Sequence, residues 1–305
     1  MSVTLTDAPL DGRFTRDRLR AALAEICAGV GLDPRGARLL RFTSNAVFRL
    51  ADQPIVVRIV GSRAMQHRVG KLVRVARWLA EHDVPAVRLV PGLEQPVHAA
   101  GYVATLWELA PEAGPRPGAG DLARLLRRLH ELPPPPFDLP RWAPLDDVRR
   151  RVADAEELAP ADRRFLMDRC AEVQAKLDRL RFPLPPGVVH GDAHLGNLIP
   201  TRDGPVLCDF DSTCFGPREW DLTPLPVGVQ RFGHPPPWHR TLAREYGFDV
   251  TGWSGFAVLR EARELKLTTS VLPILRSNPD VRVELRRRLA AFRSGDTSER
   301  WAPFR

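Results

Sequence analysis

Residues 188–221 read VVHGDAHLGNLIPTRDGPVLCDFDSTCFGPREWD, and they place acid, amide and imidazole side chains between short apolar runs. Val188-Val189 and the segment from Pro205 to Cys208 have the apolar content of short buried strands. Polar residues follow each of these strands, and loops at strand ends are where binding and catalytic groups concentrate. This stretch is therefore the predicted location of the chemistry.

The polar residues of this stretch have an order that suits phosphoryl transfer. Asp192 precedes Asn197, and the second predicted strand leads into Asp209 and Asp211. Phosphoryl transfer needs a carboxylate that accepts the proton of the attacking hydroxyl, and hard oxygen ligands that hold magnesium against the nucleotide phosphates. Asp192 fits the first role, and Asn197 and Asp209 fit the second.

The same residues carry a resemblance to a known family. His190-Gly191-Asp192 with Asn197, followed by Asp209-Phe210-Asp211, resembles the aminoglycoside phosphotransferase and choline kinase family, small-molecule relatives of the protein kinases. The resemblance implies that Asp192 is the catalytic base, that Asn197 and Asp209 bind Mg²⁺, that Asp211 assists a second metal ion, and that His190 braces the loop. It further implies structural roles for Asp221, which would tie the catalytic loop to the next helix, and for His130 beneath that loop.

The resemblance also implies an α+β fold with two lobes, like that of a protein kinase. The N-lobe, residues 1–109, would be a small antiparallel sheet with a helix that binds the nucleotide. The C-lobe, residues 110–305, would be larger and mainly helical, and would carry the catalytic loop, the metal-binding Asp and the acceptor-binding helices. The apolar pattern predicts the strands of the sheet at 37–43, 46–50, 54–60, 87–90 and 102–107.

Three parts of the chain, within residues 44–110, are expected to bind ATP or GTP. The turn at Ser44-Asn45 joins the first two strands and resembles the hairpin that covers the nucleotide phosphates in this family. Arg58 occupies the position on the third strand where a kinase has a lysine, and its guanidinium group suits phosphate. The segment Glu108-Leu109-Ala110 resembles the hinge between the lobes, whose backbone groups bond the purine.

One departure from the family keeps a second function open. The helix predicted over 63–81 has Leu72 where the family usually has a Glu that pairs with the strand lysine. The lysine and its acidic partner are thus both replaced. A nucleotide-binding pseudokinase that acts as a scaffold or sensor is the alternative hypothesis, although the intact Asp192, Asn197 and Asp209 favour an enzyme.

A hydrolytic zinc site is a third interpretation of the same loop. His190, Asp192 and His194 alternate along the chain as metal ligands could. Further His or Cys ligands at a diagnostic spacing are missing from the sequence, so phosphoryl transfer is the favoured chemistry.

The overall composition limits which kinds of partner and which cellular location are expected. The chain of 305 residues is 44% hydrophobic and 27% charged, with a formal net charge of +8. Because the basic residues are dispersed among acidic ones, nucleic-acid binding is not predicted. The sequence has no apolar run of membrane-spanning length, no recognisable signal peptide and four scattered cysteines. The expectation is a soluble cytoplasmic protein without a membrane partner, either a monomer or a homodimer.

The acceptor is expected to bind against the helical region that follows residue 222. Basic residues outnumber acidic ones there: Arg260, Arg263, Lys266, Arg276 and Arg282 against Glu261, Glu264, Asp280 and Glu284. Polycationic aminoglycosides prefer acidic pockets. The charge therefore weighs against an aminoglycoside and leaves a neutral or anionic hydroxyl compound open, whether an antibiotic, a sugar or another metabolite.

Overall fold

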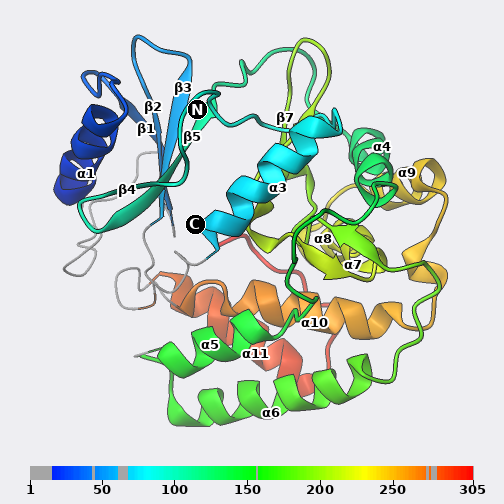
Figure 1. Ribbon diagram of the computed structural model, residues 1–305. Coiled ribbons are helices and arrows are strands. Elements are labelled where there is room, and N and C mark those ends of the chain that lie inside the picture. Colours follow the sequence, from blue (N-terminus) through cyan, green and yellow to red (C-terminus); the bar gives the residue numbers. More distant parts are fainter. Residues whose placement is uncertain are drawn as a thin grey trace.

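The computed structural model describes residues 16–42, 45–60, 68–155, 157–272, 275 and 280–304. Ser44, one of the predicted phosphate ligands, lies outside these residues. Figure 1 shows a small sheet flanked by two helices beside a larger part that is mainly helical. The predicted α+β class is therefore confirmed.

The N-terminal sheet has five antiparallel strands in the order β1-β2-β3-β5-β4. Their bounds are β1 Arg38–Phe42, β2 Asn45–Arg49, β3 Ile55–Val60, β4 Val97–Ala99 and β5 Tyr102–Glu108. Strand β3 is rich in Val and Ile, whose branched side chains pack well on a pleated surface. It lies between β2 and β5, and this central position fixes Arg58 opposite Thr105.

The predicted strand at 87–90 is wrong, because the remaining strand of the sheet is β4. The segment 87–90 lies between two neighbours instead of along one. Val87 N–H donates to the carbonyl of Leu207 at 2.9 Å, whereas Leu89 forms a single bridge with Trp107. Because some of its backbone groups bond to Leu207 in the C-terminal part and others bond to β5 of the sheet, the segment does not form a continuous ladder with either neighbour.

Two helices cover opposite faces of the sheet (Figure 1). Helix α1, Arg16–Gly29, buries its apolar side against the sheet in one core cluster. Helix α3, Val69–Glu81, occupies the described part of the helix predicted over 63–81. Its buried residues, among them Trp78 and Leu79, share a second cluster with residues of the C-terminal part such as Leu122 and Val188. Helix α3 therefore packs against both halves of the molecule.

The C-terminal part contains most of the helices and two short two-stranded sheets. The helices are α4 Ala119–His130, α5 Asp146–Asp154, α6 Pro160–Leu177, α7 Glu219–Leu222, α8 Pro224–Phe232, α9 Pro237–Tyr246, α10 Phe256–Thr269 and α11 Val281–Ser294. The sheets pair β6 Gly187–Val189 with β9 Cys214–Gly216, and β7 Leu198–Ile199 with β8 Val206–Leu207. Single 3₁₀ turns, η1 Leu195–Asn197, η2 Phe210–Ser212 and η3 Val250–Gly252, complete the described elements.

A third core cluster joins helices α5, α6, α10 and α11. In Figure 1 these helices lie together on the side of the molecule away from α3 and α4. Their packing fixes α10 beside the loop that follows β6, which becomes important for the site. Among the described residues, no helix combines the length and apolar character that crossing a membrane requires.

Candidate active site

The loop after β6 needs glycine at residue 191. Gly191 has φ +81°, in the left-handed region that glycine favours. A Cβ atom at this position would lie 2.1 Å from the carbonyl oxygen of Ser212. The loop therefore approaches the segment after Asp209 more closely than any other residue type would allow.

The carboxylate of Asp221 holds the backbone of this loop in place. The carboxylate accepts the backbone N–H of His190 at 2.6 Å and that of Gly191 at 2.8 Å, and it lies 3.0 Å from His130 Nε2. Asp221 and His130 are both almost fully buried. The indole of Trp220 adds a bond to the carbonyl of Gly191 at 3.0 Å. These contacts are those that the structural roles proposed for Asp221 and His130 require.

We predict that Asp221→Asn weakens both the fold and the activity. An Asn side chain keeps the size but has only one acceptor oxygen, so one buried N–H of the loop would face an NH₂ group. An unsatisfied buried donor costs about 1–3 kcal/mol of unfolding free energy, and a displaced loop costs up to about 100-fold in kcat. Urea denaturation and phosphoryl-transfer assays measure the two effects.

The control for this prediction is Asp203→Asn in the exposed turn before β8. That change should alter neither the unfolding free energy nor kcat. An Asp221→Asn protein as stable as the wild type would show that the carboxylate does not hold the loop.

His190 and Asn197 fix the backbone of Asp192. His190 Nε2 donates to the carbonyl of Cys208 at 2.9 Å, and its Nδ1 accepts the N–H of Asp192 at 3.3 Å. Asn197 donates its Nδ2 to the carbonyl of Asp192 at 2.9 Å. Because the amide nitrogen is used in this way, Oδ1 is the atom of Asn197 that suits a cation.

The zinc interpretation of this loop is wrong for the described residues. Among them, no three His, Cys, Asp or Glu side chains are grouped so as to hold a metal ion. Both ring nitrogens of His190 have protein partners, and His194 Nδ1 accepts the N–H of Gly196 at 3.0 Å. His194 Nε2 lies 3.9 Å from a carboxylate oxygen of Asp192.

Asp209 has the features of a magnesium ligand. Its φ of +67° is in the left-handed region, which is rare for residues other than glycine and concentrates at functional sites. The side chain of Asp209 reaches the surface, but protein atoms displace much of the water around its carboxylate. This desolvation, together with the adjacent Asp211, raises the pKa of Asp209 to about 7. A divalent cation would relieve this crowding of two carboxylates. The oxygen ligands present therefore fit Mg²⁺, which needs few protein ligands beside the phosphates.

Asp211 provides an acidic partner for Arg58. Their side chains form an ion pair between β3 and η2. On α3, Lys71 donates to the carbonyls of Asp211 at 2.6 Å and Thr213 at 2.7 Å, and burial lowers the pKa of Lys71 to about 8. Arg58 thus has its acidic partner on η2 instead of on α3, and α3 supplies a cation, Lys71, to the same segment. Sequence reasoning missed this role of Lys71; the signal was a lysine on the apolar side of an amphipathic helix.

The predicted hinge offers fewer N–H groups to a purine than the sequence indicated. Glu108 N–H donates to the carbonyl of Arg88 at 2.8 Å, and Leu109 N–H to that of Pro54 at 2.7 Å. Ala110 N–H and the carbonyl groups of the segment are the groups left as candidates. Asn45 begins β2, where it lies opposite Val60 of β3.

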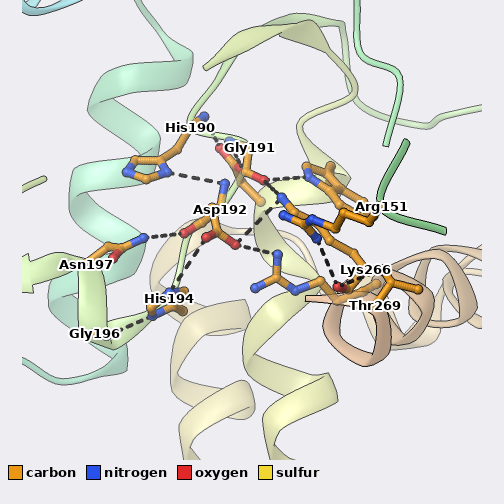
Figure 2. A network of polar contacts seen from close by, with 12 residues as sticks. Arg151, His190, Gly191, Asp192, His194, Gly196, Asn197, Lys266 and Thr269 are labelled. Atoms are coloured by element: carbon orange, nitrogen blue, oxygen red, sulfur yellow. Dashed lines mark hydrogen bonds and ion pairs between the residues drawn. The ribbon is translucent and has the colours of Figure 1, made fainter. Parts of the chain in front are cut away.

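Two cations of α10, which the sequence placed in the acceptor-binding region but not beside the proposed base, contact Asp192. Figure 2 shows one of them, Lys266, close to Asp192. Arg263 Nη1 lies 2.5 Å from Oδ1 of Asp192, and Lys266 Nζ lies 3.9 Å from the same oxygen. Burial acts to raise the pKa of Asp192, but the charges of Arg263 and Lys266 outweigh it and hold this pKa well below its usual range. The carboxylate is therefore ionised and can accept a hydrogen bond from a hydroxyl group.

Comparison with known proteins identifies the family and the fold. The model of the phosphotransferase enzyme family, APH, matches residues 38–261. A search of curated protein sequences found no significant match. An amicoumacin kinase solved with AMP-PNP, Ca²⁺ and Ami has a TM-score of 0.68 and 16% identity, over 93% of this chain and 95% of that one.

Two further solved structures have the same fold. A choline/ethanolamine kinase family protein from Mesorhizobium loti has a TM-score of 0.60 and 22% identity, over 91% of this chain and 93% of that one. The aminoglycoside phosphotransferase APH(3'')-Id from Streptomyces rimosus has a TM-score of 0.58 and 20% identity, over 81% and 98%. The predicted protein-kinase-like fold is confirmed, and since the family model covers most of the chain, the protein belongs to the phosphotransferase enzyme family.

Proposed function

We propose that this protein transfers the γ-phosphoryl group of ATP or GTP to a hydroxyl group of a small molecule. The observation that carries the proposal is the connection between the loop and the strand end. Asn197 bonds the backbone of Asp192, and the carbonyl of Asn197 accepts the N–H of Cys208 at 3.0 Å, next to Asp209. A proposed base and two proposed metal ligands therefore lie on segments that hydrogen bonds connect directly.

Each group has a defined role in this proposal. Asp192 orients the acceptor hydroxyl and takes its proton during attack, while Oδ1 of Asn197 and the carboxylate of Asp209 would hold Mg²⁺, and Asp211 would assist a second metal ion. When bound, the ion would neutralise charge on the phosphate oxygens. Arg58, which contacts Asp211, would also hold phosphate through its guanidinium group. Positioning and electrostatics supply most of the acceleration in this type of reaction.

The pseudokinase alternative loses part of its motivation. It rested on the absence of an acidic partner for the cation of β3, and Asp211 is such a partner. Retention of all three groups, Asp192, Asn197 and Asp209, also supports an active enzyme. The division at residues 109 and 110, the cytoplasmic location and the monomeric or dimeric state remain predictions.

A transfer assay tests the proposal. The purified protein is incubated with Mg²⁺ and γ-labelled ATP or GTP against a library of hydroxyl metabolites, sugars, choline and antibiotics. We expect label to move to at least one acceptor, and the Asp192→Asn and Asp209→Asn proteins to show little or no transfer. Magnesium-dependent nucleotide binding without transfer to any acceptor would instead favour a scaffold or sensor.

A further inference from the structure

Helix α10 presents positive charge to the proposed base. Arg263 and Lys266, one turn apart, both approach Oδ1 of Asp192, and Lys266 Nζ also lies 3.2 Å from the carbonyl of Gly191. Arg151 of α5 donates to the carbonyl of Lys266 at 3.4 Å (Figure 2). Two cations therefore contact the carboxylate that is proposed to contact the acceptor, and a third, Arg151, adjoins Lys266.

The acidic residues of α10 do not balance this charge. Glu264 accepts a bond from Arg231 at 2.6 Å, and both side chains are buried together. Glu261 lies 3.1 Å from Lys176 of α6. Residues three apart lie on one helix face, so the acids of α10 face other helices whereas its Arg263 and Lys266 face the site.

Asp147, a further acid near Arg151 and Lys266, has its own partners. It accepts bonds from Arg68 and Arg150, both at 2.6 Å. Arg263 is only 4% exposed, and within the part of the chain that the structure describes, its buried Nε has no hydrogen-bond partner. Keeping such a cation underpaired in the interior costs free energy, which an added anion would offset.

We infer that Arg263 and Lys266, supported by Arg151, form a subsite for an anionic group of the acceptor, a carboxylate or a phosphate. The inference rests on the proposed function, in which Asp192 contacts the acceptor hydroxyl. Since Arg263 lies 2.5 Å from Asp192, the hydroxyl and the anion belong within about 8 Å of each other in one small molecule. Hydroxy acids, sugar acids and phosphate monoesters have this chemistry, and cationic acceptors are disfavoured by repulsion.

A contact of Arg263 with the transferred phosphoryl group is the competing explanation. In that case, loss of the cation would slow transfer to every acceptor by the same factor. An acceptor subsite instead predicts that the loss depends on whether the acceptor carries an anion. The selectivity between matched acceptors therefore separates the two explanations.

The first experiment measures binding and needs no transfer activity. Malonate and inorganic phosphate are titrated calorimetrically into the protein at constant ionic strength, with and without AMP-PNP and Mg²⁺. We expect Arg263→Gln and Lys266→Met each to weaken anion binding by about 10- to 100-fold, with partial recovery in Arg263→Lys. Tighter binding of malonate would indicate a carboxylate, and tighter binding of phosphate a phosphate monoester.

Arg260→Gln is the matched control on the same helix. The Arg260 side chain lies 3.7 Å from Glu264 and is not among the cations that contact Asp192. Its anion affinity should equal that of the wild type, and circular dichroism checks that all variants fold. Absence of anion binding in the wild type, or equal binding in the Arg263 and Lys266 variants, would overturn the subsite.

The second experiment compares acceptors. For an anionic acceptor and its neutral methyl ester or amide, the ratio of their kcat/KM values should fall about tenfold or more in Arg263→Gln. An unchanged ratio would reject the subsite and leave the phosphotransferase function intact. Anion binding that depends on Arg263, without transfer to any acceptor, would support the subsite and reject the proposed function.

Discussion

Replacing Asp192 by Asn will lower kcat by about 10²- to 10⁴-fold, the usual contribution of a positioned general base. The amide cannot take the hydroxyl proton, and its NH₂ group cannot accept the hydrogen bond that orients the attack. Nucleotide binding should survive, because the groups proposed to hold the nucleotide lie on β3, the hinge and the segment around Asp209. Single-turnover kinetics and nucleotide titration measure the two quantities separately.

Asp192 also has a structural contribution that the experiment must separate. Its carboxylate is the partner of Arg263, so its neutralisation leaves a buried cation less well paired and should lower the Tm. Activity is therefore compared well below the Tm of each protein, and Asp203→Asn in the exposed turn before β8 serves as the control for a lost surface carboxylate. Turnover by Asp192→Asn equal to that of the control would remove Asp192 from the mechanism.

Replacing Asp209 by Asn will have opposite effects on activity and on stability. One ligand oxygen of the proposed magnesium site becomes a weaker, uncharged donor, so we expect kcat/KM to fall by about 10²- to 10³-fold, similar to the loss of one strong electrostatic group elsewhere. In metal-free buffer, however, the change relieves the repulsion between Asp209 and Asp211 that raises the pKa of Asp209. The Tm in EDTA should be equal to that of the wild type or higher.

Asp211→Asn is the matched control, because it removes the neighbouring carboxylate and with it the charge that pairs Arg58. Its Tm in EDTA should fall, since breaking a largely buried ion pair is destabilising. Thermal denaturation with EDTA, and with Mg²⁺ and AMP-PNP, measures both variants. Equal Tm gains on adding Mg²⁺ and nucleotide in the wild type and Asp209→Asn would show that Asp209 does not hold the ion.

Local sequence determined the elements that have a strong pattern of their own. The Val- and Ile-rich run at 55–60 forms β3, and the apolar stripe at 69–81 forms α3, because side-chain periodicity fixes which face of each element is buried. The motif His190-Gly191-Asp192 was recognisable for a different reason. Its glycine is required because position 191 has no room for a Cβ atom, and its polar residues are neighbours in the sequence.

The tertiary structure decided what depends on distant residues. Segment 87–90 is as apolar as a strand, yet it bonds partly to Leu207 of the other half of the chain and forms no ladder. Arg58 pairs with Asp211, which is 153 residues away in the sequence, and Asp192 pairs with Arg263, which is 71 residues away. Such ion pairs have no local signature, since they arise only when the packing of α3 and α10 brings separate elements together. Sequence alone therefore determined the class of chemistry, whereas packing determined the charges that surround Asp192.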